Sequence, residues 1–342
     1  MSNRWPGGLI RKTPVTPAGP FQNGAAPGVW TLAEAAFWTK QGLWPIAGNV
    51  ADGTFGIFAL GQVSGGSTTR DKYTYSGDVV GAATAATVAS SFGSAAGNST
   101  VGIFALGANA CNVRLTTRNK YTYVGCVVSV GGVATVASQG GSAAGNSTVG
   151  IFALGLTCGG NVTTRNKYTY SGDVVSAGGA ATAASKSGAA TGNSTVGIFA
   201  LGEICGSPST TRNKYTYSGD VVSAGGAATV ASSFGSAAGN STVGIFALSN
   251  TACGRVTTRD KYTYSGCVVS AGGAATGASW IGSATGNSTV GIFALGRNCG
   301  FTNTTTRNKY TYSGCVVAAG GAATAASAAG SAAGNGTLGV NT

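Results

Sequence analysis

Residues 147–193 read STVGIFALGLTCGGNVTTRNKYTYSGDVVSAGGAATAASKSGAATGN, and this stretch recurs with small changes along the chain. GIFAL begins at Gly56, Gly102, Gly150, Gly197, Gly244 and Gly291, and KYTY begins at Lys72, Lys120, Lys167, Lys214, Lys261 and Lys309. Copies about 47 residues apart indicate a repeat architecture. We therefore expect six structural repeats in residues 48–342, preceded by an unrelated segment at residues 1–47.

Each repeat is predicted to contain four β-strands. SAA before a Gly-Asn turn is a short strand of small residues, and VGIFALG is apolar on both faces, as in a strand covered on both sides. TTRNKYTY alternates, with Tyr73 and Tyr75 on one face and Arg70 and Lys72 on the other. A Ser-Gly-Asp or Ser-Gly-Cys hairpin turn then leads into a strand at VVSAGG.

A four-stranded sheet that is repeated radially is the blade of a β-propeller. The sequence thus predicts an all-β fold with six blades, and a stacked β-solenoid is the alternative. The chain ends in GSAAGNGTLGV, a copy of GSAAGNSTVGI. We expect residues 328–340 to supply the innermost strand of the first blade, whose other strands come from residues 54–88. PIAGN at residues 45–49 competes for that position.

The repeat also resembles the Kelch repeat. An apolar strand ending in glycine precedes an aromatic KYTY strand, where Kelch repeats carry a tyrosine. The pattern departs from Kelch because LG replaces GG, the arginine of the innermost strand is absent, and Val79 or its equivalents take the tryptophan position. The resemblance implies a Kelch-like β-propeller fold and does not extend to the Kelch partners.

The repeats differ from one another in two regions. The spacing from each KYTY lysine to the next GIFAL glycine is constant, whereas the loop between the second and third strands varies in length and sequence. The second variable region is a residue pair before each innermost strand, such as Ser233-Phe234. In an antiparallel blade both regions leave the sheet on the same face, and function usually lies on variable loops over a rigid scaffold.

We expect recognition on this variable-loop face, although drift in exposed loops would give the same pattern. The loops at residues 108–115 and 297–304 are the first choices. The candidate recognition residues are Asn109, Asn112, Arg114, Asn161, Glu203, Arg255, Trp280, Arg297 and Phe301.

Composition argues against an enzyme. The 342 residues include 59 glycines, eight acidic residues and no histidine. The missing histidine excludes a Ser-His-Asp triad and any histidine-ligated metal. We expect no catalytic residues, no metal site and no cofactor. The N-terminus MSNRWPGGLIRKTP lacks the apolar core of a signal peptide, so the eight cysteines are expected to be reduced and buried.

The net charge of +12 comes largely from one Arg/Lys pair in each repeat, such as Arg70/Lys72 and Arg118/Lys120. We expect these side chains to hydrogen-bond loop carbonyls and to lie on the blade edges. An acidic partner or anionic surface polymer fits this charge better than nucleic acid, because the pairs do not form a continuous groove. Asn-Ser-Thr recurs at Asn98, Asn146, Asn193, Asn240 and Asn287, where it indicates turn chemistry rather than glycosylation.

The segment at residues 1–47 has a different character. Residues 1–30 are rich in proline and glycine, which predicts an extended arm that gains order against a partner. TLAEAAFWTKQG predicts one short helix with a capping box between Thr31 and Glu34 and a stop at Gly42. The candidate anchor residues are Trp5, Trp30, Leu32, Phe37, Trp38 and Trp44.

This segment resembles the N-terminal part of structural proteins of tailed bacteriophages, especially marine ones. The matching residues are the PGGLIRKTPV start, within Trp5–Val15, and GVWTLAEAAFWTKQGLWP, Gly28–Pro45. The resemblance implies a virion protein on the tail or capsid exterior, similar to tail-fibre proteins. It would be made in the host cytoplasm, without membrane insertion, and residues 1–47 would bind other virion subunits.

The leading hypothesis is therefore a non-enzymatic tail appendage or host-attachment module, whose variable-loop face contacts a glycan or protein of the host surface. The alternatives are a capsid decoration or tail scaffold protein and a soluble glycan-binding propeller.

Overall fold

The computed structural model describes residues 31, 33–34, 36–37 and 53–335. The chain divides into two units, Met1–Asp52 and Gly53–Thr342. In the first unit, Ala33, Glu34, Ala36 and Phe37 are helical. The Thr31 amide and hydroxyl both donate to Glu34 Oε2 at 2.8 Å, and the Glu34 amide donates to Thr31 Oγ1 at 3.2 Å. The predicted capping box is confirmed.

The anchor prediction falls largely outside the described residues. Phe37 is described and exposed, whereas Trp5, Trp30, Leu32, Trp38 and Trp44 lie outside them. Gly42 and residues 45–49 also lie outside the described part.

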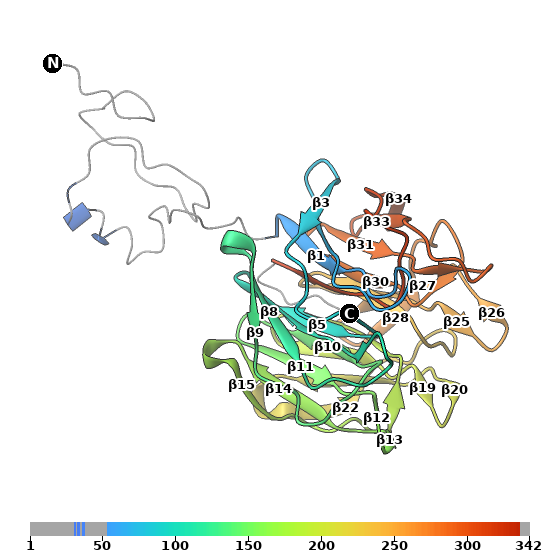
Figure 1. Cartoon of the computed structure of the whole chain (residues 1–342). Helices are drawn as coiled ribbons and strands as arrows, with labels where there is room; N and C mark the ends of the chain where they lie inside the picture. The colour runs from blue at the N-terminus through green and yellow to red at the C-terminus, as the bar shows by residue number, and fades with distance from the viewer. Residues whose placement is uncertain (1–30, 32, 35, 38–52, 336–342) are drawn as a thin grey trace. The chain divides into compact units, whose positions relative to one another are not determined.

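The second unit is all-β and contains six four-stranded antiparallel sheets, which follow one another as the colour runs from blue to red in Figure 1. We number them by repeat. Sheet 1 is β35 (Ser331–Gly334), β1 (Phe55–Ala59), β2 (Arg70–Thr74) and β3 (Val79–Ala83). Sheet 2 is β5 (Ser94–Gly97), β6 (Val101–Ala105), β8 (Arg118–Thr122) and β9 (Val127–Val130). Sheet 3 is β10 (Ser142–Gly145), β11 (Val149–Ala153), β14 (Arg165–Thr169) and β15 (Val174–Ala177).

The remaining sheets repeat the same strand order. Sheet 4 is β17 (Ala189–Gly192), β18 (Val196–Ala200), β21 (Arg212–Thr216) and β22 (Val221–Ala224). Sheet 5 is β23 (Ser236–Gly239), β24 (Val243–Ala247), β27 (Arg259–Thr263) and β28 (Val268–Ala271). Sheet 6 is β30 (Ser283–Gly286), β31 (Val290–Ala294), β33 (Arg307–Thr311) and β34 (Val316–Ala319). Short 3₁₀ turns, η1 (Val124–Cys126), η2 (Ser171–Asp173) and η3 (Ser218–Asp220), join the last two strands of sheets 2, 3 and 4. The four predicted strands per repeat are confirmed.

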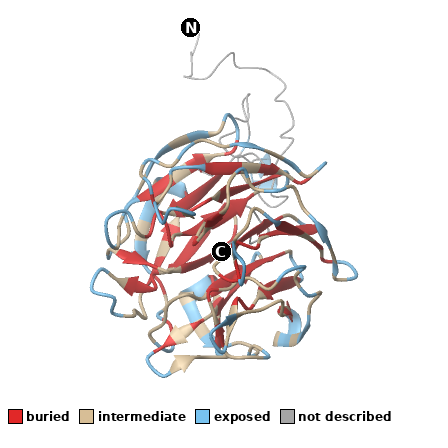
Figure 2. Ribbon diagram, turned by 90° about the vertical axis from the view of Figure 1, so that its right-hand side faces the viewer, coloured by how far each residue is buried: buried red, intermediate tan, exposed pale blue. Residues whose placement is uncertain are grey.

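Burial falls from the first strand of each sheet to the last, as Figure 2 shows. The SAAG strand is buried throughout, and the VGIFA strand is buried except at its last residue. The final strand is mostly exposed. In sheet 3, Ile151 and Phe152 point to opposite faces and are both buried because a neighbouring sheet covers each face.

The first strands of the six sheets contact one another in a cyclic order, β35, β5, β10, β17, β23, β30 and back to β35. A cycle of backbone hydrogen bonds runs parallel to it. Each amide in this cycle donates to the carbonyl of the preceding member at 2.7–3.1 Å. The members are Phe92, Gly140, Ser187, Phe234, Ile281 and Ala329, and Phe92 N donates to Ala329 O to complete the cycle.

Sheet 1 joins the two ends of the repeat region. β35 pairs antiparallel with β1, with Gly56 opposite Gly334 and Ala59 opposite Ser331. The Phe55 amide also donates to Asn335 Oδ1 at 2.9 Å. The expectation that the C-terminal copy supplies the missing strand is confirmed for Ser331–Gly334, and residues 336–342 lie outside the described part.

The repeated arginines were misplaced by the sequence analysis. They do not lie on the blade edges, because all six are at most 2% exposed between neighbouring sheets. Arg118 on sheet 2 donates to Asn166 Oδ1 on sheet 3 at 3.0 Å, and its guanidinium carbon lies 4.6 Å from the Phe152 ring centroid. The expected carbonyl contact is present but long, at 3.4 Å to Gly132 O. Burial lowers the pKa of Arg118 to about 10.

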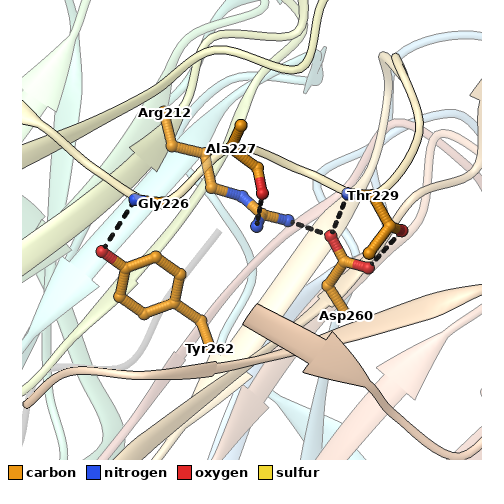
Figure 3. Close-up of polar contacts among 6 residues, drawn as sticks. All are labelled: Arg212, Gly226, Ala227, Thr229, Asp260 and Tyr262. Atoms are coloured by element: carbon orange, nitrogen blue, oxygen red, sulfur yellow. Dashed lines mark hydrogen bonds and ion pairs between the residues drawn. The ribbon is translucent and has the colours of Figure 1, made fainter. Parts of the chain in front are cut away.

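Two of the six arginine junctions contain a carboxylate instead of an asparagine. Figure 3 shows the junction between sheets 4 and 5, where Arg212 Nη2 lies 2.7 Å from Asp260 Oδ2. Thr229, in the connection between the sheets, donates to both oxygens of Asp260. The second carboxylate junction joins sheets 6 and 1 through Arg307 and Asp71 at 2.8 Å. The arginines are therefore structural links, and their charge is not available at the surface.

The repeated lysines form a second set of junctions. Lys120, Lys167 and Lys309 bind the Ser-Gly-Asp turn of the next sheet, at Asp173, Asp220 and Asp78, with distances of 2.9–3.0 Å. A tyrosine of the same sheet donates to each of these aspartates, as Tyr168 does to Asp173 at 2.7 Å. In the other three repeats a cysteine replaces the aspartate: Cys126, Cys267 and Cys315. The link between sheets 6 and 1 thus has a carboxylate at both its arginine and its lysine.

Candidate recognition surface

The two variable regions lie together in the structure. Short strands join them in three repeats: β4 (Ser90–Ser91) with β7 (Ala108–Asn109), β16 (Ser185–Lys186) with β19 (Glu203–Ile204) and β20 (Ser207–Pro208), and β29 (Ser279–Trp280) with β32 (Arg297–Asn298). Single bridges join them in the others: Gln62–Ala328, Gln139–Leu156 and Ser233–Asn250. The loop hairpins β12 (Leu156–Thr157)/β13 (Gly160–Asn161) and β25 (Asn250–Thr251)/β26 (Gly254–Arg255) were not predicted.

Three of the predicted recognition residues form one cluster. The Arg255 guanidinium carbon lies 4.7 Å from the Trp280 ring centroid and 4.2 Å from that of Phe301. The Trp280 and Phe301 rings are edge to face at 6.1 Å. Phe301 is 67% exposed, which is the largest exposure of any large apolar side chain in the described part of the chain. Arg255 Nη1 also donates to Cys299 O at 2.8 Å, which ties the loop of sheet 5 to that of sheet 6.

A fourth member of this aromatic cluster, Phe234, was not selected from the sequence. Its ring lies edge to face with Trp280 at 5.4 Å. The sequence signal was present, because Phe234 and Trp280 both belong to the variable residue pairs that precede the innermost strands. We call Phe234, Arg255, Trp280 and Phe301 the aromatic cluster. Trp280 Nε1 and Arg255 Nε are buried and have no hydrogen-bond partner in the described residues, so neither atom is exposed to a ligand.

Arg297 lies next to the cluster and links two repeats. It is the strand partner of Trp280. Its Nε donates to Asn303 Oδ1 and its Nη2 to Gln62 Oε1, both at 2.9 Å. Asn303 in turn donates to Gln62 O at 2.9 Å. Gln62 and Asn303 are loop residues that were not selected from the sequence, because the variable loops share no residue pattern that would mark them.

The remaining candidates do not join this cluster. Asn109 and Asn112 shape one turn: Asn109 Oδ1 accepts from the amides of Cys111 and Val113, and Asn112 has a φ of +60°. Asn161 pairs with Leu156 in a loop hairpin. These asparagines thus have structural uses that their residue type allows.

Two charged candidates lie in other loops. Glu203 forms an ion pair with Lys186 at 3.2 Å. Arg114 lies in the loop of sheet 2, with its Nη1 3.9 Å from Cys158 Sγ of sheet 3. The described variable loops carry four cations, Arg114, Lys186, Arg255 and Arg297, against the single carboxylate of Glu203. The variable loops in the described part of the chain therefore carry a net charge of +3.

The cycle of six backbone hydrogen bonds surrounds a small opening. Its cavity of about 40 Å³ is lined by Phe92, Phe234, Ile281 and Ala329 together with glycines. Its non-glycine members have φ between +52° and +56°, a left-handed conformation that side chains rarely adopt. The volume suits a few water molecules and is too small for a sugar ring or a peptide.

The five loop cysteines correct another expectation. Cys111, Cys158, Cys205, Cys253 and Cys299 are exposed, so the prediction of buried thiols is wrong for them. They occupy loop tips, where no neighbouring sheet covers the thiol. Cys126, Cys267 and Cys315 are half-buried at the Ser-Gly-Cys turns. All eight are free thiols in the structure.

The repeated Asn-Ser-Thr turns have one geometry. Asn98 Oδ1 accepts from the amides of Thr100 and Val101 and from the Thr100 hydroxyl, at 2.9–3.0 Å. Asn98 Nδ2 donates to Ser147 O of the next repeat at 2.9 Å. The same two roles recur at Asn146, Asn193, Asn240 and Asn287. These side-chain amides are used in the turn and in the link to the next repeat.

Comparison with known proteins gives no relative: no family model matches the chain, and no curated protein does. Within residues 53–335 and the five described residues of the first unit, no three of Cys, Asp and Glu come close enough to hold a metal ion. The same residues contain no helix that is long and apolar enough to cross a membrane.

Proposed function

We propose that this chain is a non-enzymatic binding protein of a virion, in which a six-bladed, Kelch-like β-propeller presents one recognition face. The propeller interpretation is supported by six four-stranded sheets, by the cyclic contacts of their first strands and by the cycle of backbone hydrogen bonds. In this arrangement β35 completes the first blade. The solenoid alternative provides no reason for the pairing of β35 with β1.

The observation that carries the recognition function is the aromatic cluster on the variable loops. An exposed aromatic residue beside an arginine is typical of binding surfaces, because the ring supplies contact area and the guanidinium supplies charge. Only sheets 5 and 6 carry it, so we propose one principal site rather than six equivalent sites. The excess of cations over carboxylates favours an anionic host glycan or an acidic host protein as the ligand.

The virion setting is supported by the resemblance of residues 5–15 and 28–45 to tailed-bacteriophage structural proteins. In the proposal, residues 1–47 anchor the protein to the particle and the propeller extends outward. A capsid decoration or tail scaffold protein would use the same anchor, but its loops would contact only virion subunits. Attachment to the host is preferred because the loops differ from repeat to repeat and expose Phe301.

A binding experiment tests the recognition proposal. Purified wild-type protein and the variants Arg255→Ala and Phe301→Ala are applied to host cells, and bound protein is measured by flow cytometry. Both variants are expected to lose at least tenfold in apparent affinity, whereas Ser171→Ala, at an exposed turn outside the variable loops, is expected to bind like the wild type. Equal binding by all four proteins would refute the recognition site.

A second experiment tests the location. Immunogold labelling of intact particles with an antibody to the repeat region is expected to mark the tail or its fibre tips. Label spread over the capsid would favour decoration, and absence of label with free protein in the lysate would favour a soluble glycan-binding protein. Deletion of residues 1–44 is expected to leave a folded repeat region and to abolish incorporation into particles.

A further inference from the structure

Sheet 2 ends in a group of exposed valines that breaks the symmetry of the repeats. Val124, Val127, Val130, Val133 and Val136 are 40%, 55%, 65%, 57% and 46% exposed, respectively. The corresponding residues of the third repeat are Ser171, Val174, Ala177, Ala180 and Ala183. Val124, Val130 and Val133 have no valine counterpart in any other repeat. We call these five residues the valine edge.

The valine edge lies on and next to an edge strand. β9 is the last strand of its sheet and pairs only with β8, with Val130 opposite Asn119 and Val127 opposite Thr122. On an antiparallel edge, alternate residues turn their N–H and C=O groups away from the sheet. These groups can accept another strand, and natural proteins usually prevent this with lysine, proline or a bulge.

No such protection is present here. Residues 121–140 contain no charged residue and no proline, in a chain whose net charge is +12. Two positively charged copies of the chain repel each other when they meet through most parts of their surface. Contact through residues 121–140 brings no charged side chains of this stretch together. It also offers no charge to attract an acidic or basic partner. A partner that is itself uncharged and rich in β-branched residues fits it best.

We propose that the valine edge binds a second copy of this chain. Antiparallel pairing of β9 with β9 of the copy about a twofold axis satisfies the outward backbone groups of both strands, because a twofold interface places the same residues on both sides. It also buries Val130 and its neighbours on each copy. Because β9 is only four residues long, the contact is small, and we expect the dimer to be weak and concentration-dependent.

Sedimentation velocity of the full-length protein at physiological salt, over a concentration series into the hundred-micromolar range, tests this proposal. The wild type is expected to shift reversibly from monomer to dimer. Val130→Lys combined with Val133→Lys is expected to weaken dimerisation at least tenfold. The matched control combines Ala177→Lys with Ala180→Lys on sheet 3 and adds the same charge at the equivalent positions, so it is expected to dimerise like the wild type.

Three outcomes would overturn the proposal. They are a wild type that stays monomeric throughout the series, a Val130/Val133 variant that dimerises as well as the wild type, and an equal loss of dimer in the control. Thermal unfolding of each variant confirms that it is folded before it is compared. Because the assay contains no host cell and no particle, its result is independent of the proposed attachment function.

Discussion

At the scale of single residues, the buried arginines determine how the sheets are joined. Six guanidinium groups are almost fully buried, and only two of them face a carboxylate. The other four combine an asparagine oxygen with an aromatic face, as Arg165 does with Asn213 and Phe199. Breaking a buried ion pair leaves an unpaired charge, which is more costly than the loss of a neutral hydrogen bond.

Arg212→Met is therefore expected to lower the free energy of unfolding by about 3–5 kcal/mol, because Asp260 is left buried without its partner. Arg165→Met is expected to cost about 1–3 kcal/mol, since Asn213 still accepts from the Thr182 amide. Denaturant titrations of both variants provide the comparison. Adding Asp260→Asn to Arg212→Met should recover part of the loss, and equal losses in the two single variants would contradict this account.

The tyrosines make stability sensitive to alkali. Burial is the main cause that raises the pKa of all twelve tyrosines above the ordinary value of 10, to about 12 at Tyr262 and Tyr310. Above pH 10 the unfolded chain loses phenolic protons that the folded chain keeps, so stability falls as pH rises toward 12. The six buried arginines, whose pKa values burial lowers, act in the opposite direction but are fewer.

Thermal unfolding between pH 6 and pH 12 checks this expectation, with tyrosinate absorbance recorded in parallel. The melting temperature is expected to fall steeply above about pH 10, and tyrosinate should appear together with unfolding. Tyrosines that ionise near pH 10 in a protein that remains folded would show that the rings are accessible.

At the scale of elements, glycine occupies the point of close approach between sheets in five of the six connections. A Cβ added to Gly179, after β15, would lie 2.2 Å from the carbonyl oxygen of Asp220 in the turn of the next sheet. This close approach is the physical reason for the second glycine of the VVSAGG motif, a reason that cannot be read from the sequence alone. In the first repeat this position is Thr84, whose hydroxyl donates to Cys126 O.

Gly179→Ala is expected to reduce the free energy of unfolding by about 1–3 kcal/mol, because the methyl group must displace backbone atoms at the junction. Gly277→Ala is the matched control, since nothing lies within 4 Å of its added Cβ. It should be neutral or slightly stabilising. Urea titrations of the two variants distinguish them, and a neutral Gly179→Ala would show that the sheets pack less tightly than described.

The elements also show what a sequence can reveal. Strand positions followed from the period and from the alternation in VGIFALG and RNKYT, because these patterns are local. The burial of Arg118 could not be predicted in this way. It depends on Phe152 and Asn166 of the next repeat, and no local sequence pattern shows that these residues come close to Arg118. The aromatic cluster was found in part: Arg255, Trp280 and Phe301 stand out by type, whereas Phe234 gains its role from loops that meet only in three dimensions.

At the scale of the whole molecule, the proposed propeller requires the sheets to form a closed cycle. Sheet 1 is assembled from both ends of the repeat region, through β35 and β1. The link between sheets 6 and 1 is the one described junction in which both the arginine and the lysine meet a carboxylate, at Asp71 and Asp78. The chain runs from β34 into β35, so its break within the ring lies inside sheet 1, between β35 and β1. The two links to Asp71 and Asp78 hold the N-terminal strands of sheet 1 to sheet 6 beside that break.

Hydrogen exchange of the intact protein, read out by mass spectrometry, tests this closure most directly. In a closed ring, the amides of β35 open only with global unfolding. We expect β35 and β1 to be protected to within a few-fold of the equivalent strands β17 and β18 of sheet 4. Exchange of β35 that is orders of magnitude faster, with β17 still protected, would show that the C-terminal strand frays and that the six sheets do not form a closed ring.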